Sequence, residues 1–120
     1  MITRLSRMAF YVGLPLVVAL SLIPQDAMPA PSLGDKAGHA LAYAALAVAG
    51  GIGHRGLRSL ILVALGLLLL GAALELAQSA LPGRIASLYD VLANAIGIVL
   101  GSLFAGGANA LWPKRRPSTG

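Results

Sequence analysis

The chain has 120 residues, of which 58% are apolar and 11% are charged. Soluble domains carry about 25% charged residues, so this composition excludes an ordinary water-soluble protein. The hydrophobicity also excludes an intrinsically disordered chain. The net charge is +5, but basic and aromatic residues do not alternate, so we expect no nucleic-acid partner. The absence of cysteine excludes disulfides, thiol nucleophiles and cysteine-based metal sites.

Four apolar stretches come close to the length of about 20 residues that a bilayer-spanning helix needs. The second is rich in alanine and glycine, and the third contains four consecutive leucines. Because these stretches nearly exhaust the chain, we predict a single membrane domain over residues 1–120 that ends in a basic tail at 113–120. The fold class is an all-α bundle of four transmembrane helices. The predicted spans are residues 8–23, 37–53, 59–81 and 88–111.

A cleaved signal peptide is the alternative for the first stretch, since Arg4 and Arg7 precede it. Its apolar run is at or beyond the length of about 7–15 residues that a signal core has. Neither Ala27 nor Ala30 has a small residue two positions before it, as a cleavage site requires. We therefore expect a membrane helix.

Lysine and arginine predict the orientation, because cytoplasmic loops hold an excess of these residues. They cluster before the first span, between the second and third spans, and after the fourth, so these three segments share one side. All four acidic residues lie in or near the other two loops. We predict that both termini are cytoplasmic and that the loops at 26–36 and 82–87 face outside.

The loop lengths and aromatic residues add two expectations. The connection around Pro82 is only a few residues long, so spans three and four should be antiparallel neighbours. Phe10, Tyr11 and Trp112 fall near the cytoplasmic interface, where amphipathic rings are favoured. His54 lies in the cytoplasmic loop and is expected to be solvated.

Polar residues of the last three spans fall at one depth, close to the predicted outer surface. On each span they recur at intervals of three or four residues, which keeps them on one helix face. Gly71 and Pro82 share the face of the third span. The polar residues are Asp35, Lys36, His39 and Tyr43 on or just before the second span, Glu75 and Gln78 on the third, Arg84 after it, and Asp90 and Asn94 on the fourth.

Charged side chains in this set need partners, because an unpaired charge in hydrocarbon is costly. Glu75 and Asp90 are the acids nearest to the membrane interior, and Lys36, His39 and Arg84 are the available cations. We expect the acids to be paired with them. A structural role competes for Asp90, because Ser87 reads as an N-cap with Asp90 as a first-turn acid.

Small residues repeat every four positions on the fourth span and include Gly97 and Gly101. Such a repeat lets two helix backbones approach closely. Because both glycines lie on the same stripe as Asp90 and Asn94, we favour packing inside the bundle. A homodimer through Gly97 and Gly101 is the alternative.

The order of these residues resembles the VanZ-like family of small bacterial membrane proteins. The resemblance covers residues 33–105, and Ala80 departs from it where many relatives have an aromatic residue. It implies a plasma-membrane protein of the bacterial cell envelope, and the family's namesake is associated with low-level resistance to the lipoglycopeptide teicoplanin. The pattern is Asp35-Lys36-x-x-His39-x-x-x-Tyr43, Glu75-x-x-Gln78-x-x-x-Pro82-x-Arg84 and Asp90-x-x-x-Asn94-x-x-Gly97-x-x-x-Gly101.

The residues support several functions. The first is an outward-facing pocket for a lipid, a lipid-linked precursor or a lipoglycopeptide, in which Lys36 and Arg84 would hold a phosphate or carboxylate. The alternative is a membrane-embedded hydrolase or transferase, in which Glu75 and His39 exchange protons and Asp90 is a further candidate. A purely structural cluster is a third interpretation. A metal site made of His39, Glu75 and Asp90 and an ion-transport role are weaker alternatives, and no cofactor is expected.

Overall fold

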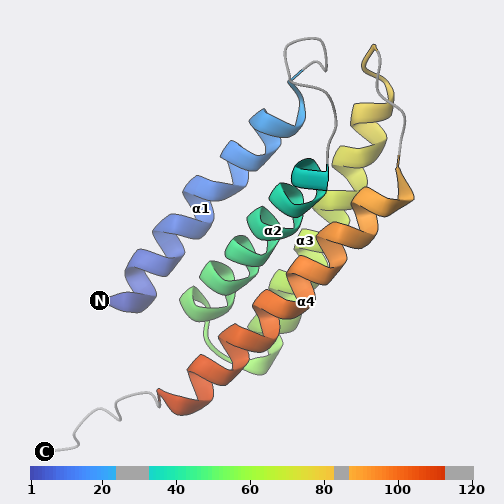
Figure 1. Cartoon of the computed structure of the whole chain (residues 1–120). Helices are drawn as coiled ribbons and strands as arrows, with labels where there is room; N and C mark the ends of the chain where they lie inside the picture. The colour runs from blue at the N-terminus through green and yellow to red at the C-terminus, as the bar shows by residue number, and fades with distance from the viewer. Residues whose placement is uncertain (24–32, 83–86, 113–120) are drawn as a thin grey trace, which may run out of the picture.

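The computed structural model describes residues 1–23, 33–82 and 87–112, without the side chains of residues 33–35 (Figure 1). These residues form a bundle of four α-helices, which confirms the all-α class. No strand occurs within the described ranges. The helices are α1 (Ile2–Ser21), α2 (Leu33–Gly53), α3 (Leu57–Ser79) and α4 (Leu88–Leu111).

The helix boundaries differ most from the predicted spans at the beginning of α1 and α2. The first helix begins at Ile2 rather than at residue 8, so Arg4 and Arg7 lie within it. A helix can continue past the apolar stretch there because long basic side chains reach toward water. The second helix begins at Leu33 rather than at residue 37, which places Lys36 in its first turns. The fourth helix has the predicted bounds.

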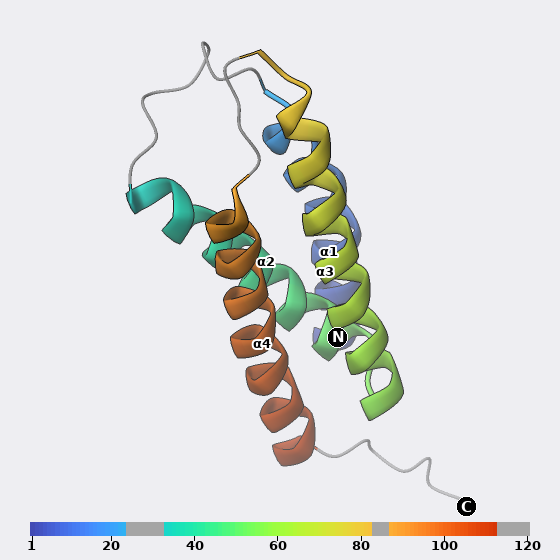
Figure 2. The same ribbon diagram turned by 90° about the vertical axis from the view of Figure 1, so that its right-hand side faces the viewer.

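Three of the four helices, α1, α3 and α4, are long and apolar enough to cross a membrane. Helix α2 does not meet this criterion. Its many alanines and glycines give it a less hydrophobic composition. Helix α2 contacts all three other helices, and in Figure 2 it runs diagonally behind α4 toward the side on which α1 and α3 lie. A helix that is covered by protein needs less apolar surface than one that faces lipid. The crossing of the membrane by α2 stays a prediction.

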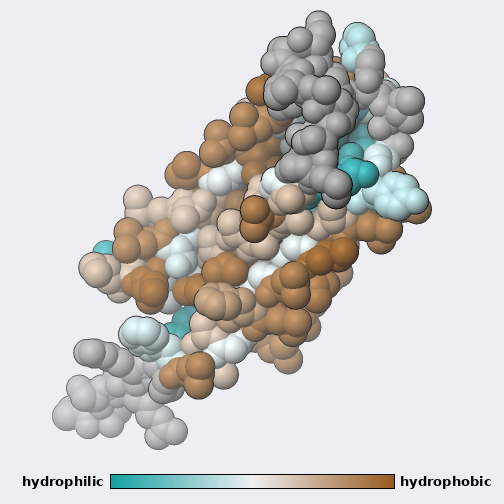
Figure 3. Space-filling model, in the orientation of Figure 1, coloured by the Kyte–Doolittle hydropathy of each residue, from teal (hydrophilic) through white to brown (hydrophobic). Residues whose placement is uncertain are grey.

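The surface of the bundle is largely apolar. In the view of Figure 3, hydrophobic residues cover the middle of the visible face, and the hydrophilic ones lie toward its two ends. Large side chains are widely exposed, among them Leu69, Leu103 and Phe104. Soluble monomers rarely expose apolar area on this scale, because it is unfavourable in water. This surface indicates a membrane protein.

Helix α4 makes its most extensive contact with α2 and a smaller one with α3, the neighbour that the short loop predicts. The glycine stripe produces the close contact. A Cβ atom at Gly97 would lie 2.9 Å from the carbonyl carbon of Ala40, and one at Gly101 would lie 2.9 Å from the Cβ of Ala47. Within one chain, α2 therefore occupies the face that a dimer through Gly97 and Gly101 would need.

The bundle has two distinct ends. The terminal end holds Met1, Trp112 and the link between α2 and α3 at residues 54–56 (Figure 1). The loop end holds Leu22, Leu81 and Ser87, where the other two links begin or finish. The distribution of basic residues predicts that the loop end faces outside. This orientation stays a prediction.

Candidate functional site

The inward face of α3 carries polar side chains into the bundle near the loop end. Glu75 and Gln78 are 7% and 5% exposed, and Gly71 is buried beside them, as the spacing predicts. Pro82, which is predicted to share this face, lies beyond the end of α3 and is exposed. The reason is that α3 ends at Ser79, so Pro82 no longer follows the helical register.

Tyr43 of α2 and Asn94 of α4 meet at Gly71 of α3. Tyr43 is 1% exposed and Asn94 is 5% exposed. A Cβ at Gly71 would lie 3.3 Å from Nδ2 of Asn94 and 3.5 Å from Cε1 and Cζ of Tyr43, so glycine leaves the room for both. Glu75 lies one turn farther along α3 and is also buried. We call Tyr43, Glu75 and Asn94 the polar cluster.

Glu75 binds the beginning of α4. Its Oε1 accepts a hydrogen bond of 2.6 Å from the backbone N–H of Ser87. A carboxylate is favoured there, because the N-terminus of a helix carries a partial positive charge. The sequence predicts a cationic side chain as the partner of Glu75. The structure shows a backbone N–H as its partner.

Lys36 does not neutralise Glu75. It is exposed at the loop end, and its Nζ lies 4.9 Å from the centre of the Tyr89 ring. This cation–π contact joins the first turns of α2 and α4. Sequence reasoning missed Tyr89, although an aromatic residue in the first turn of a membrane helix is a usable signal. The predicted partner Arg84 lies outside the described residues.

Gln78 joins α3 to the end of α1. Its Nε2 donates a hydrogen bond of 2.6 Å to the backbone oxygen of Ser21, the last residue of α1. The last carbonyls of a helix have no partner within the helix, so Gln78 satisfies one of them. This contact gives Gln78 a structural role in addition to its predicted place in the site.

Asn94 has a buried oxygen without a partner. Its Oδ1 makes no hydrogen bond in the part of the chain that the structure describes. A buried acceptor of this kind costs about 1–3 kcal/mol if it stays unpaired, so native proteins usually supply water or a ligand group to it. Asn94 is therefore the member of the cluster that is open to a bound donor.

Among the described residues, neither His39 nor Asp90 makes a hydrogen bond or ion pair with Glu75. His39 is half-buried and makes no hydrogen bond or ion pair to another described residue. Asp90 is half-buried in the first turn of α4. No group of three metal-ligating side chains occurs among the described residues, so His39, Glu75 and Asp90 do not form the alternative metal site. The side chain of Asp35 lies outside the description.

Ser87 stands at the N-cap position of α4, as predicted, and Asp90 is the first-turn acid. The Ser87 side chain makes no capping hydrogen bond. Ser87 acts through its backbone N–H, which binds Glu75. The capping prediction is therefore correct in position and wrong in the atom involved.

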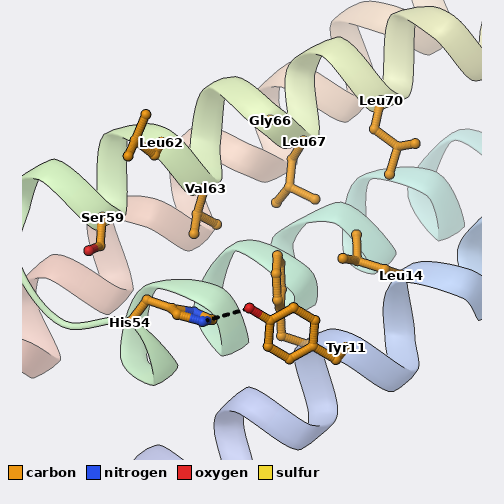
Figure 4. A pocket seen from close by; sticks show the side chains of 10 residues that line it. Tyr11, Leu14, His54, Ser59, Leu62, Val63, Gly66, Leu67 and Leu70 are labelled. Atoms are coloured by element: carbon orange, nitrogen blue, oxygen red, sulfur yellow. Dashed lines mark hydrogen bonds between the residues drawn. The ribbon is translucent and has the colours of Figure 1, made fainter.

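A second group of side chains, at the terminal end, escaped prediction. His54 is half-buried, and its Nε2 lies 3.0 Å from the Tyr11 hydroxyl while its Nδ1 lies 3.2 Å from the Gly50 oxygen (Figure 4). The ring of Phe10 packs against His54 edge to face. The expectation that His54 is solvated is therefore wrong. The Gly50 carbonyl in the last turn of α2 and the Tyr11 hydroxyl of α1 provide partners that a prediction of a solvated loop could not include.

Arginine side chains also close this end. Arg7 donates from Nε to the Gly53 oxygen at 2.8 Å. Arg55 donates from Nη2 to the oxygen of Asn109 in the last turn of α4 and to that of Trp112, the residue that follows the helix. Cationic side chains are favoured at helix C-termini, where carbonyls lack partners. These bonds show that two of the basic residues used to predict orientation also join helices.

Comparisons with known proteins identify no family for this chain. No family model matches it, and no curated protein or solved structure matches it either. The VanZ-like resemblance therefore rests on the spacing of residues 33–105 and stays a prediction.

Proposed function

We propose that the polar cluster binds the headgroup of an amphiphilic molecule of the bacterial cell envelope. The observation that carries this proposal is the Oδ1 of Asn94, which is buried without a partner among the described residues, on a side chain that meets Tyr43 at Gly71. A cluster with only a structural role would be expected to satisfy its own polar groups. Glu75 does so by accepting from the Ser87 N–H, and the neighbouring Gln78 does so by donating to the Ser21 oxygen.

The chemistry of the cluster favours a ligand that donates hydrogen bonds. Asn94 offers an acceptor oxygen, the carboxylate of Glu75 is an acceptor when ionised, and the Tyr43 hydroxyl can donate or accept. Sugar hydroxyls and amines are donors of this kind, and lipids, lipid-linked precursors and lipoglycopeptides carry them. Lys36, exposed at the loop end, would contact an acidic group of the same ligand.

The proposal includes the orientation and the location. The beginning of α1 and the end of α4 lie at the terminal end (Figure 1), where Arg4, Arg7, Arg55 and Arg58 are also found. Positively charged segments favour the cytoplasmic side, so the polar cluster would lie in the outer half of the plasma membrane. An envelope molecule could reach it from that side. The VanZ-like resemblance supports the same location, and a role in glycopeptide resistance would follow if the ligand were a lipoglycopeptide.

Native mass spectrometry of the purified protein tests the proposal. Wild type should retain a defined amphiphile, and Asn94→Ala should lose it. Ser102→Ala is a matched control, because Ser102 is also on α4 and its buried Oγ is also unpaired among the described residues. Equal retention by the wild type and by both variants would contradict binding at the polar cluster.

The hydrolase or transferase alternative is tested with Glu75→Gln. The glutamine keeps an oxygen for the Ser87 N–H, so the local fold should persist. A binding protein would retain the same molecule in both forms. An enzyme would retain substrate in the variant and product in the wild type, and the two would differ in mass. Among the described residues, His39 makes no hydrogen bond or ion pair with Glu75. This alternative therefore has no direct contact in its favour.

A further inference from the structure

A groove separates α1 from α3 near the terminal end. It has a volume of about 460 Å³, and the two helices that form its walls touch each other only slightly. Figure 4 shows Tyr11 and Leu14 of α1 on one side and Val63 and Leu67 of α3 on the other. All lining residues belong to the described part of the chain. The groove shares no lining residue with the polar cluster, which lies in the half of the bundle nearer to the loop end.

The lining changes from polar to apolar along the bundle. His54 and Ser59 lie at the terminal end of the groove, where the Tyr11 hydroxyl also meets His54. Beyond them the α3 wall is apolar as far as Leu70. A molecule that fills this groove must therefore have a polar part at one end and a hydrocarbon part along the remainder.

The length of the groove matches one leaflet of a membrane. Ser59 and Leu70 are separated along the α3 axis by about 16 Å, at a rise of 1.5 Å per residue. Half of a hydrocarbon core about 30 Å thick is about 15 Å. A lipid tail that begins at the polar end would thus run along the groove within a single leaflet.

Positive charge stands at the polar end. Arg58 lies one turn before Leu62 on α3, is exposed, and makes no hydrogen bond to another described residue. Helix α3 also begins there, at Leu57, without a side-chain cap. A free helix N-terminus and a juxtamembrane arginine both favour an anionic group.

We propose that this groove holds one acyl chain of an anionic phospholipid, with its phosphate beside Arg58 and the beginning of α3. The occupant comes from the leaflet at the terminal end. The inference requires that the bundle lies in a membrane, and it does not depend on a ligand at the polar cluster.

A larger side chain at Gly66 would enter the groove without strain. Gly66 lines the groove, and a Cβ placed on it would meet nothing within 4 Å. A leucine there would project into the space that the acyl chain needs, and it is a better helix former than glycine. Gly107→Leu is the matched control, because a Cβ at Gly107 on α4 also meets nothing within 4 Å.

Native mass spectrometry with added phosphatidylglycerol or phosphatidylcholine of equal chain length tests the proposal. Wild type and Gly107→Leu should bind one phosphatidylglycerol, and Gly66→Leu should bind it about tenfold more weakly. Arg58→Gln should weaken phosphatidylglycerol binding about fivefold and leave phosphatidylcholine binding unchanged. Equal binding of phosphatidylglycerol by Gly66→Leu and wild type would overturn the proposal. A wild-type dimer that Gly66→Leu converts to monomers would also overturn it, since a second copy would then fill the groove.

A second measurement uses the unaltered protein. Phosphatidylglycerol with a photoreactive group in its acyl chain should label peptides from residues 59–70 more strongly than the α4 segment at residues 99–107, where Val99, Leu103 and Phe104 are exposed. Equal labelling of both segments would show only bulk lipid and would overturn the proposal. Because Gly66→Leu leaves Asn94 untouched, failure here would be distinct from failure of ligand binding at the polar cluster.

Discussion

At the scale of single residues, the buried polar groups near the loop end differ in whether the protein satisfies them. Glu75 accepts from the Ser87 N–H, and Gln78 donates to the Ser21 oxygen. The Oδ1 of Asn94 has no partner in the described structure. Removing a made hydrogen bond leaves a buried group unsatisfied, whereas removing an unpaired atom does not.

Asn94→Ala should therefore change the free energy of unfolding of the ligand-free protein by less than about 1 kcal/mol. Asn109→Ala should destabilise it by about 1–2 kcal/mol, because Nδ2 of Asn109 donates to the Gly51 oxygen at 2.9 Å. Thermal unfolding in a fixed detergent measures both. Greater destabilisation by Asn94→Ala than by Asn109→Ala would show that Asn94 is satisfied within the protein.

Gln78→Leu should destabilise the bundle by about 1–3 kcal/mol, since the terminal carbonyl of α1 would lose its buried donor. Ser79→Ala is the control. Within the described part of the chain its hydroxyl bonds only to Leu76 of the same helix, and it is exposed, so its removal should have little effect. The same unfolding assay compares them, and equal stability of the two variants would argue against the link between α1 and α3.

At the scale of helices, the contact of α4 with α2 depends on two glycines. Both Gly97 and Gly101 are buried, and the backbone carbonyls of Ala40 and Ala44 lie where a side chain would begin. A backbone cannot move aside as a flexible side chain does. Even one methyl group at these positions must therefore push the two helices apart.

Gly97→Ala should destabilise the protein by about 1–3 kcal/mol through overpacking. Gly107→Ala lies on the same helix with open space around its Cβ position, and it should stabilise the helix by about 0.5–1 kcal/mol. Resistance to unfolding by denaturing detergent reports both effects. If Gly97→Ala were as stable as Gly107→Ala, the close contact of α2 with α4 would be contradicted.

The four helices and their inward faces could be predicted because apolar length and intervals of three or four residues are local properties. Gly71, Glu75 and Gln78 are buried together for this reason. The partner of each face could not be predicted, since it depends on packing between distant segments. Glu75 binds a backbone N–H, Lys36 meets Tyr89, and His54 meets Tyr11, contacts that no spacing within one helix specifies.

At the scale of the whole molecule, the orientation in the membrane decides which compartment the polar cluster faces. Cysteines at Ala30 and Gly83 should react with an impermeant thiol reagent on intact cells, and one at Thr119 should react only after the cells are opened. All three positions lie outside the described residues, in segments with predicted sides. The opposite labelling pattern would place the polar cluster in the cytoplasmic half of the membrane and remove its access to the envelope.

The most direct test of ligand binding is photochemical capture in cells. A photoreactive phenylalanine analogue in place of half-buried His39, one turn from Tyr43 toward the loop end, should form an adduct with a defined envelope amphiphile. The same analogue at Leu41, which is 70% exposed on α2, should capture only bulk phospholipid. Mass spectrometry identifies the adducts. Identical adducts at the two positions would contradict a binding site at the polar cluster.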